Sequence, residues 1–141
     1  MRLIPVDKEN RSAYKVFEQA KDLPTYLSRI YPNLEASYLK WMYIEEDGNY
    51  IGSVWLEGQD TRRAKLGIFI ADPAYRDKGI GKYAIQKMIS LAKSDGIDII
   101  TLNVRVGNLR ARKVYAACGF KEEKRFKKEN GIEVFSMELV L

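Results

Sequence analysis

The stretch 75–85, "YRDKGIGKYAI", combines two glycines one residue apart with basic side chains and leads into a helical pattern. Successive backbone N–H groups at the start of a helix can bind a phosphate, and the helix N-terminus adds partial positive charge. Glycine suits such a turn because a Cβ would keep a phosphate away from the backbone. The loop is a candidate phosphate site, and a tight turn without a ligand remains the alternative. The residues concerned are Arg76, Lys78, Gly79, Gly81 and Lys82.

Two other phosphate-binding devices fit this loop poorly. A P-loop needs four residues between its glycines, whereas one residue separates Gly79 from Gly81. The dinucleotide fingerprint G-x-G-x-x-G/A is matched literally through Ala84, but that loop begins where its strand ends, and "ADPAYRDK" intervenes here. The nearby acid, Asp98, opens the next strand instead of ending it. A P-loop is excluded, and a dinucleotide loop is disfavoured.

A second pattern lies at 108–120, "NLRARKVYAACGF". Asn108 can cap a helix, and Gly119-Phe120 is typical of a helix C-terminus. Tyr115 falls on the apolar face of that helix. A tyrosine in such a stripe is either a packed core aromatic or a proton donor to a reacting group. Spacing alone leaves both interpretations open.

Composition limits the chemistry available to the chain. Its 141 residues, 46% of them hydrophobic, are enough for one domain over 1–141. The sequence has no histidine and one cysteine, Cys118, which removes the commonest metal ligand and general base and any internal disulfide. We therefore expect no metal site and no Ser-His or Cys-His hydrolase. No apolar run approaches a membrane span, so we expect a cytoplasmic protein without membrane attachment.

The charge is distributed unevenly along the chain. Residues 1–63 hold 9 Lys/Arg against 10 Asp/Glu, whereas residues 64–141 hold 15 against 9. The second half is suited to an anionic partner, although charged faces are often only solvated. Nucleic acid is the other partner that such a balance suggests.

Hydrophobic periodicity and turn residues indicate the elements that must position these groups. A right-handed strand–helix–strand crossover with parallel strands is expected across 64–106. Hairpin turns are expected at Asp47-Gly48 and Asn130-Gly131. The expected strands are 2–6, two runs within 40–58, 64–73, 97–106 and two runs within 121–141. The expected helices carry the apolar face Ala13, Val16, Phe17 and Ala20, a short segment 34–39, a segment before Gly96, and one after Asn108.

Residues 76–81 resemble the R/Q-x-x-G-x-G/A signature of the GNAT superfamily of N-acetyltransferases. Residues 108–120 resemble that family's N-x-x-A-x-x-x-Y-x-x-x-G-F element, at the expected separation. The resemblance is close over 64–120 and otherwise follows only the order of elements. It implies an α/β (α+β) fold, with one GNAT-like domain, a mixed central sheet of about seven strands with a splayed parallel pair, and about four helices.

The same resemblance implies acetyl-CoA as co-substrate, held where the two parallel strands separate. Tyr115 would donate a proton to the leaving sulfur, and Asn108 would help to place the cofactor or act only as a helix cap. The implied binding residues are the strand Ile68, Phe69 and Ile70 for the pantetheine arm, and the backbone of Arg76, Asp77, Lys78, Gly79, Ile80, Gly81 and Lys82 for the pyrophosphate.

The general base is not evident from the sequence. Lys65 stands where many relatives have a carboxylate, so Glu57 is the candidate side chain. A water chain is the competing interpretation of the base, and a solvated loop acid is the competing interpretation of Glu57. The proposed acceptor is an amine of a small molecule or peptide, a cationic one being favoured by nearby aromatics and acids. Those residues are Tyr26, Tyr31, Trp41, Trp55, Glu45, Glu46, Asp47 and Glu57.

The resulting expectation is an acetyl-CoA-dependent N-acetyltransferase that binds no nucleic acid, with a homodimer allowed. A non-catalytic acyl-CoA-binding or regulatory domain is the alternative, because no acid stands at the expected position. The identity of the acceptor and acyl groups other than acetyl are not defined by the sequence.

Overall fold

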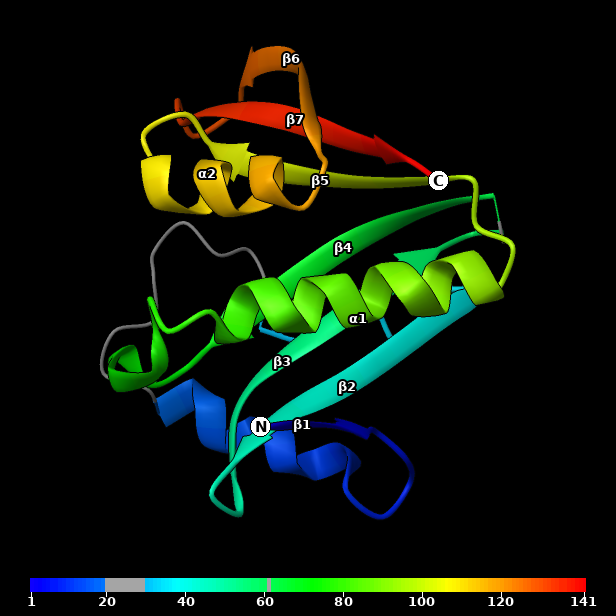
Figure 1. The fold of residues 1–141 in the computed structure, drawn as a ribbon, viewed down its shortest axis with the longest axis vertical. Helices are drawn as coiled ribbons and strands as arrows, with labels where there is room; N and C mark the ends of the chain where they lie inside the picture. The colour runs from blue at the N-terminus through cyan, green and yellow to red at the C-terminus, as the bar shows by residue number, and fades with distance from the viewer. Residues whose placement is uncertain (20–29, 61) are drawn as a thin grey trace.

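The computed structural model describes residues 1–19, 30–60 and 62–141. Ala20 and Tyr26, both used in the sequence analysis, lie outside the described residues. The strands form one mixed sheet in the order β1-β2-β3-β4-β5-β7-β6 (Figure 1). They are β1 (Arg2–Pro5), β2 (Tyr38–Glu46), β3 (Asn49–Gly58), β4 (Arg63–Ile70), β5 (Ile99–Arg105), β6 (Lys121–Lys127) and β7 (Glu133–Val140). The described helices are α1 (Ile80–Ser94), α2 (Leu109–Ala117) and the 3-10 helices η1 (Arg11–Gln19) and η2 (Pro73–Tyr75).

The expected fold class is confirmed, with differences at the N-terminal end. The segment that carries Ala13 and Phe17 is a 3-10 helix, not an α-helix. The short helix expected at 34–39 is wrong, because the chain turns near Asn33 and enters β2 at Tyr38. The first expected hairpin is confirmed, with Asp47 and Gly48 both at positive φ. No helix among the described residues is long and apolar enough to cross a membrane.

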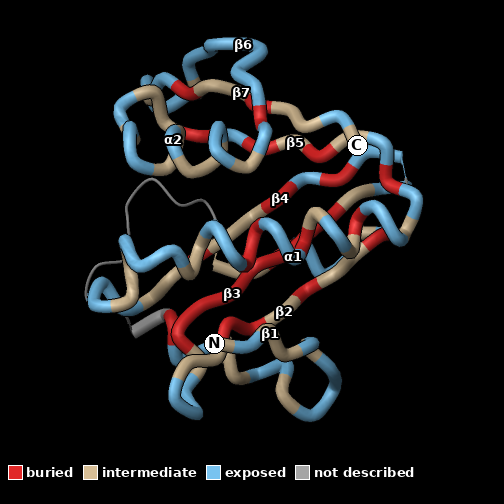
Figure 2. The backbone as a smooth tube through the Cα atoms, viewed as in Figure 1, coloured by how far each residue is buried: buried red, intermediate tan, exposed pale blue. Residues whose placement is uncertain are grey.

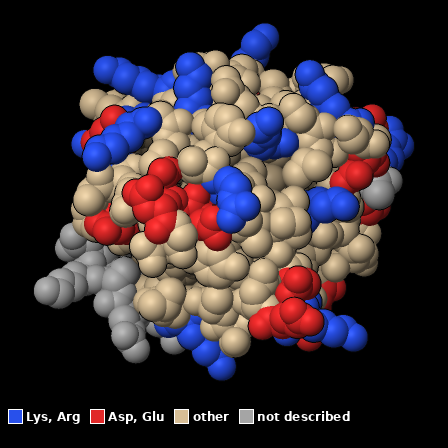
Figure 3. Space-filling model, turned by 60° about the horizontal axis from the view of Figure 1, so that its bottom comes forward, with Lys and Arg blue, Asp and Glu red and all other residues tan. Residues whose placement is uncertain are grey.

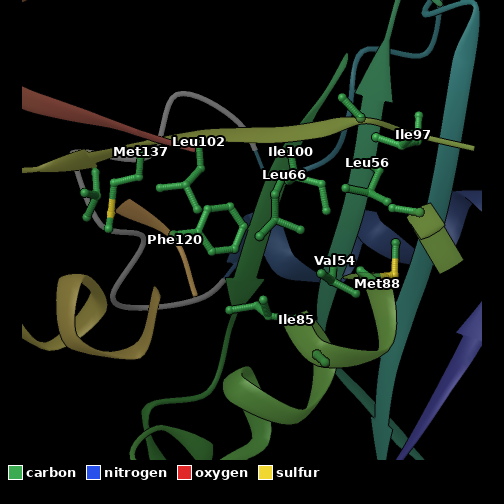
Figure 4. Packing of buried hydrophobic residues seen from close by; sticks show 14 of the residues in the cluster. Val54, Leu56, Leu66, Ile85, Met88, Ile97, Ile100, Leu102, Phe120 and Met137 are labelled. Carbon is green, nitrogen blue, oxygen red and sulfur yellow. The ribbon is translucent and has the colours of Figure 1, made fainter. Parts of the chain in front are cut away.

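Helices α1 and α2 cover the same face of the sheet, and the main hydrophobic core lies beneath them (Figure 1). Ile85 and Met88 point from α1 toward Val54, Leu56 and Leu66 on the central strands (Figure 4). Each fully buried side chain of this size contributes roughly 1.5–3 kcal/mol to folding. Strand β3 is almost entirely buried, whereas β6 at the sheet edge is exposed throughout (Figure 2). The core therefore fixes α1 firmly over β3 and β4.

The opposite face of the sheet carries an aromatic cluster of Phe17, Trp41, Tyr43, Trp55 and Phe69. Its polar atoms are paired: the Trp41 Nε1 donates to Ser53 Oγ at 2.7 Å inside the protein. The two faces of the sheet thus differ in chemistry, one aliphatic beneath α1 and α2 and one aromatic.

The parallel pair β4–β5 separates after a short contact. Their register runs from Arg63–Ile99 to Lys65–Thr101 and then stops. Beyond that point the two strands diverge in Figure 1, and residues 66–70 of β4 pair with no described strand on the side facing β5. The splayed pair expected from the sequence is confirmed, and it opens a gap in the middle of the sheet.

Candidate active site

A cleft of about 260 Å³ lies where β4 and β5 separate. Its walls are the end of β4, the start of α1 and one face of α2. Ten of the residues expected to bind the cofactor line it: Ile68, Phe69, Ile70, Arg76, Asp77, Gly79, Gly81, Lys82, Asn108 and Tyr115. Lys78 in the loop and Ile80 at the start of α1 do not line the cleft.

The N-terminus of α1 opens into this cleft. Gly79 precedes the helix in the left-handed conformation at φ 79°, and no side chain within the described residues caps the helix there. The first intrahelical bond runs from Tyr83 N to Gly79 O, which leaves the N–H groups of residues 80–82 before it. These groups and the helix dipole make the end of the cleft a site for an anion.

Neither the backbone conformation nor the packing of the described residues requires a glycine at position 81. A Cβ built there would lie 3.8 Å from Ile70 Cδ1 and 3.9 Å from Ile68 Cδ1, which is ordinary contact, and its φ is not positive. The space that a larger side chain would fill is the cleft itself. This is the observation expected of a backbone that a phosphate must approach closely, so the residues present fit the cofactor that the sequence implies.

The loop before α1 is anchored to β4. The Arg76 guanidinium donates to the Ile70 carbonyl from Nη2 at 2.9 Å and from Nε at 3.3 Å. Asp72 accepts from Ala74 N at 2.9 Å and so fixes the turn η2. The positive charge of Arg76 is therefore held at the end of β4 and also positions the loop.

Helix α2 forms the other wall of the cleft. Asn108 Oδ1 accepts from Ala111 N at 3.2 Å, which confirms the expected helix cap, and Asn108 also lines the cleft. Tyr115 is a packed aromatic that also lines the cleft, and its role as a proton donor stays a prediction. Its ring packs edge to face on Phe120, with centroids 6.1 Å apart, while the residue lines the cleft. The packing against Phe120 restricts the orientation of the Tyr115 ring.

Glu57 is not a solvated loop acid. It is 8% exposed, and its carboxylate accepts from Asn33 N at 2.9 Å and from Trp55 Nε1 at 3.2 Å. It does not line the cleft. On the neighbouring strand it stands opposite Lys65, the last residue of β4 that pairs with β5. The carboxylate therefore lies beside the point where the strands separate, on the aromatic face of the sheet.

The aromatic residues expected near the acceptor gather on this same face. Trp41 and Trp55 belong to the aromatic cluster, and Tyr31 packs against Tyr14 with ring centroids 4.6 Å apart. The Trp55 indole occupies the space beside Gly67, because a Cβ built on Gly67 would overlap it. Gly67 thus allows the indole to lie against β4, next to the separation of the strands.

The acids of the first hairpin do not belong to this group, which corrects the sequence-based expectation. Glu45 pairs with Arg2, and Glu46 lies 3.5 Å from the N-terminal amine. Asp47 forms the exposed turn between β2 and β3. Their positions follow from the β2–β3 register, which puts Glu57 and the turn at opposite ends of the hairpin.

The single cysteine is not placed as a nucleophile. Burial raises the pKa of the Cys118 thiol, and the positive charge of Lys82 only partly offsets this. Cys118 does not line the cleft. The shift disfavours the reactive thiolate and the thiol lies outside the cleft, so an acyl group is not expected to pass through an enzyme thioester.

Sequence reasoning missed four residues that line the cleft. Ile85, Ala111 and Val114 supply apolar wall, and Arg110 adds a positive charge beside Asp77. The apolar residues were visible only as core faces of their helices. Arg110 carries no signal of its own, because its position across from the glycine loop depends on how α2 packs.

A family model of the "Acetyltransferase (GNAT) family" matches residues 5–120, which contain the cleft and both motifs. The chain belongs to the acetyltransferase (GNAT) family. The sequence-based recognition is thereby confirmed, with acetyl-CoA as the family's acetyl donor. In this GNAT domain, the residues that line the cleft between β4 and β5 fit that donor.

Curated relatives match at low identity. The chain is 28% identical to a mycothiol acetyltransferase of Beutenbergia cavernae over 58% of the chain and 28% of that protein. It is 33% identical to an uncharacterized N-acetyltransferase of Methanocaldococcus jannaschii over 61% of the chain and 45% of that protein. The chain thus spans less than half the length of these two relatives. It is 26% identical to a [ribosomal protein bS18]-alanine N-acetyltransferase of Haemophilus ducreyi, covering 83% of the chain and 79% of the relative.

Solved structures share the fold. A spermidine N-acetyltransferase from Vibrio cholerae in complex with CoA and spermine superposes with a TM-score of 0.77, at 19% identity, over 99% of this chain and 94% of that one. A probable acetyltransferase gives a TM-score of 0.66 at 26% identity, over 74% of this chain and 62% of the other. At these identities the first similarity establishes the architecture, and substrate preference is a separate question.

Proposed function

We propose that this GNAT domain transfers the acetyl group of acetyl-CoA directly to the nitrogen of an amine. The observation that carries the proposal is the cleft at the β4–β5 separation, which has the uncapped N-terminus of α1 at one end and Tyr115 in its wall. Every relative and solved neighbour named above is an acetyltransferase, which supports a catalytic domain over a non-catalytic binding domain.

The residues divide into three tasks. The backbone of residues 79–82 binds the pyrophosphate, and the edge of β4 from Ile68 to Ile70, which pairs with no described strand on the side facing β5, binds the pantetheine arm. The bound cofactor supplies an activated acetyl thioester. Tyr115 donates its hydroxyl proton to the sulfur as the carbon–sulfur bond breaks. Direct attack by the amine fits the position of Cys118, which does not line the cleft.

The amine must lose a proton when its nitrogen bonds to the acetyl carbon. Glu57 is the side chain proposed to receive it, directly or through water, from the aromatic face of the sheet. Its support is the position of the carboxylate beside Lys65 and Trp55, next to the strand separation. Trp41 and Trp55 are buried, each about 5% exposed, so we place a cationic amine on the half-buried Tyr31 that packs against their cluster, because aromatic faces attract cations.

We expect Glu57→Gln to lower kcat/KM for an amine acceptor about tenfold or more, since it removes a charged hydrogen-bond acceptor. The deficit should shrink from pH 7 to pH 9, because a larger fraction of the amine is already neutral at the higher pH. Steady-state rates at both pH values measure this. Glu123→Gln on the exposed strand β6 is the matched control. Full activity in a folded Glu57→Gln protein would assign the proton to water instead.

We expect a cationic amine to be preferred over matched neutral and acidic amines. A lysine-like amine has a pKa of ~10.4 and an α-amino group ~7.7–8.0, so the reactive neutral fraction grows as pH rises from 6 to 9. Thiol release from acetyl-CoA should rise over that range. The panel includes spermidine and a peptide with N-terminal alanine, the acceptors named for a structural neighbour and a relative. Preference for the acidic acceptor, or a flat profile with chemistry limiting, would contradict the proposal.

The nucleic-acid alternative has less support. On the face in Figure 3, Lys and Arg side chains alternate with groups of Asp and Glu instead of merging into one basic patch. The basic groups of the second half also include Arg76, Lys82 and Arg110, which line the cleft. Part of the positive charge of the second half therefore faces the cleft, where it suits a small polyanion such as CoA.

A further inference from the structure

An ion pair spans the two walls of the cleft. Arg110 Nε lies 2.9 Å from Asp77 Oδ1, and both residues line the cleft. Asp77 belongs to the glycine loop before α1, and Arg110 to the first turn of α2. Both side chains are more than half exposed, at 54% and 67%. An exposed pair of this kind gains little from its mutual attraction, so a stronger ligand can separate it.

Asp77 holds a backbone conformation that is unusual for its type. Its φ is +64°, in the left-handed region that Asn and Asp tolerate better than other non-glycine residues. Asp77 is also the only acid among the described residues that line the cleft, where Arg76, Lys82 and Arg110 are the bases. The carboxylate thus sits at the end of the cleft where the cofactor phosphates are expected.

Arg110 differs from the other two bases in what holds it. The Arg76 guanidinium is bound to the Ile70 carbonyl, which is neutral, and Lys82 forms no ion pair with a carboxylate among the described residues. Arg110 alone among them is paired with an acid. A guanidinium prefers the two oxygens of a phosphate, which it can bind in a bidentate manner, to one exposed carboxylate oxygen.

We propose that Asp77 competes with the cofactor phosphates for Arg110 and so weakens cofactor binding. In the free protein the carboxylate occupies the guanidinium. On binding, Arg110 leaves Asp77 for a phosphate, and Asp77 remains as a like charge near the phosphates. Asp77 therefore acts against retention of the spent cofactor and favours its release. The inference rests on the proposed phosphate site at the start of α1.

The competition model fixes the sign of each substitution. Asp77→Asn removes the competitor and keeps a residue that tolerates φ +64°. It should tighten binding of CoA about 2–5-fold, the range given by exposed ion pairs of up to ~1 kcal/mol. Arg110→Gln should weaken CoA binding about 3–10-fold, as the net loss of one exposed hydrogen bond predicts. Lys113→Gln removes the same charge from an exposed position of α2 outside the cleft and should leave affinity nearly unchanged.

Calorimetry with the intact chain tests this, using CoA and pantetheine, which lacks the phosphates, with thermal unfolding as a check on folding. The expected result is tighter CoA binding in Asp77→Asn with unchanged pantetheine binding, and a much smaller gain in the Asp77→Asn/Arg110→Gln double variant. If both single substitutions weakened CoA binding equally, the competition model would be overturned. The ion pair would then hold the two walls of the cleft in place for the ligand. Unchanged affinity in both would make it a surface pair only. If the parent chain binds no CoA, the phosphate site fails first, and this inference with it.

Discussion

Tyr115→Phe should turn over acetyl-CoA with a kcat about 10²–10⁴-fold below that of the parent chain, the range typical of a lost general acid. Phenylalanine keeps the ring that packs edge to face on Phe120, so the wall of the cleft should be preserved. The hydroxyl is the only group removed, and it is the group proposed to protonate the leaving sulfur. Steady-state thiol release gives kcat, and calorimetry gives CoA affinity, which should change little.

Tyr83→Phe is the matched control. Tyr83 lies on α1 with 44% of its surface exposed and does not line the cleft. The same loss of a hydroxyl there should leave kcat unchanged. Replacing acetyl-CoA by a thioester with a more acidic thiol should also restore part of the Tyr115→Phe rate, because such a thiolate leaves without a proton. Parental turnover by Tyr115→Phe would return the residue to a purely packing role.

Gly81→Val should weaken acetyl-CoA binding by at least about tenfold, or 1.4 kcal/mol, while the protein stays folded. Nothing within the protein opposes a Cβ at this position, since the nearest atoms are 3.8 and 3.9 Å away. The added methyl groups would extend into the cleft and separate a phosphate from the N–H groups of residues 80–82. The displaced phosphate would lose its hydrogen bonds to these N–H groups. Hydrogen bonds of this charge-assisted kind are about twice as strong as neutral ones.

Calorimetry measures the affinity, and circular dichroism with thermal unfolding checks the fold. Gly107→Val serves as control, because a Cβ at Gly107 meets nothing within 4 Å, its φ is not positive, and it does not line the cleft. Gly81→Ala should fall between the parent and the valine variant. Unchanged affinity in a folded Gly81→Val protein would mean that no phosphate approaches this backbone.

Local pattern brought together most of the residues that line the cleft, because the features involved are local. A phosphate loop needs a run of N–H groups from neighbouring residues, and a helix cap needs one side chain near three amides. Residues 76–82 and Asn108 were therefore placed correctly in the cleft, apart from Lys78 and Ile80. The roles of these residues in binding and catalysis remain predictions.

Sequence reasoning was weaker wherever a site depends on register or packing. Glu57 lies beside the strand separation only because β3 pairs with β4 in a register that sets it against Lys65. The pairing of β2 with β3 places the acids of the first hairpin at the opposite end of the strands, away from Glu57. Segment 34–39 shows a third cause. Its apolar residues suit either a helix or the entry to a strand, and the pairing of Tyr38 with Gly58 decides for the strand.

The short contact between β4 and β5 has a mechanical meaning. Three residue pairs form the only ladder between the four strands β1 to β4 and the three strands β5 to β7 among the described residues. The sheet thus consists of two parts, β1–β4 and β5–β7. They are joined by this short ladder, and α1 and α2 pack against both on one face. A ligand bound along this edge of β4 would take the place of the missing ladder. Filling the gap would then also restrict movement between the two parts of the sheet.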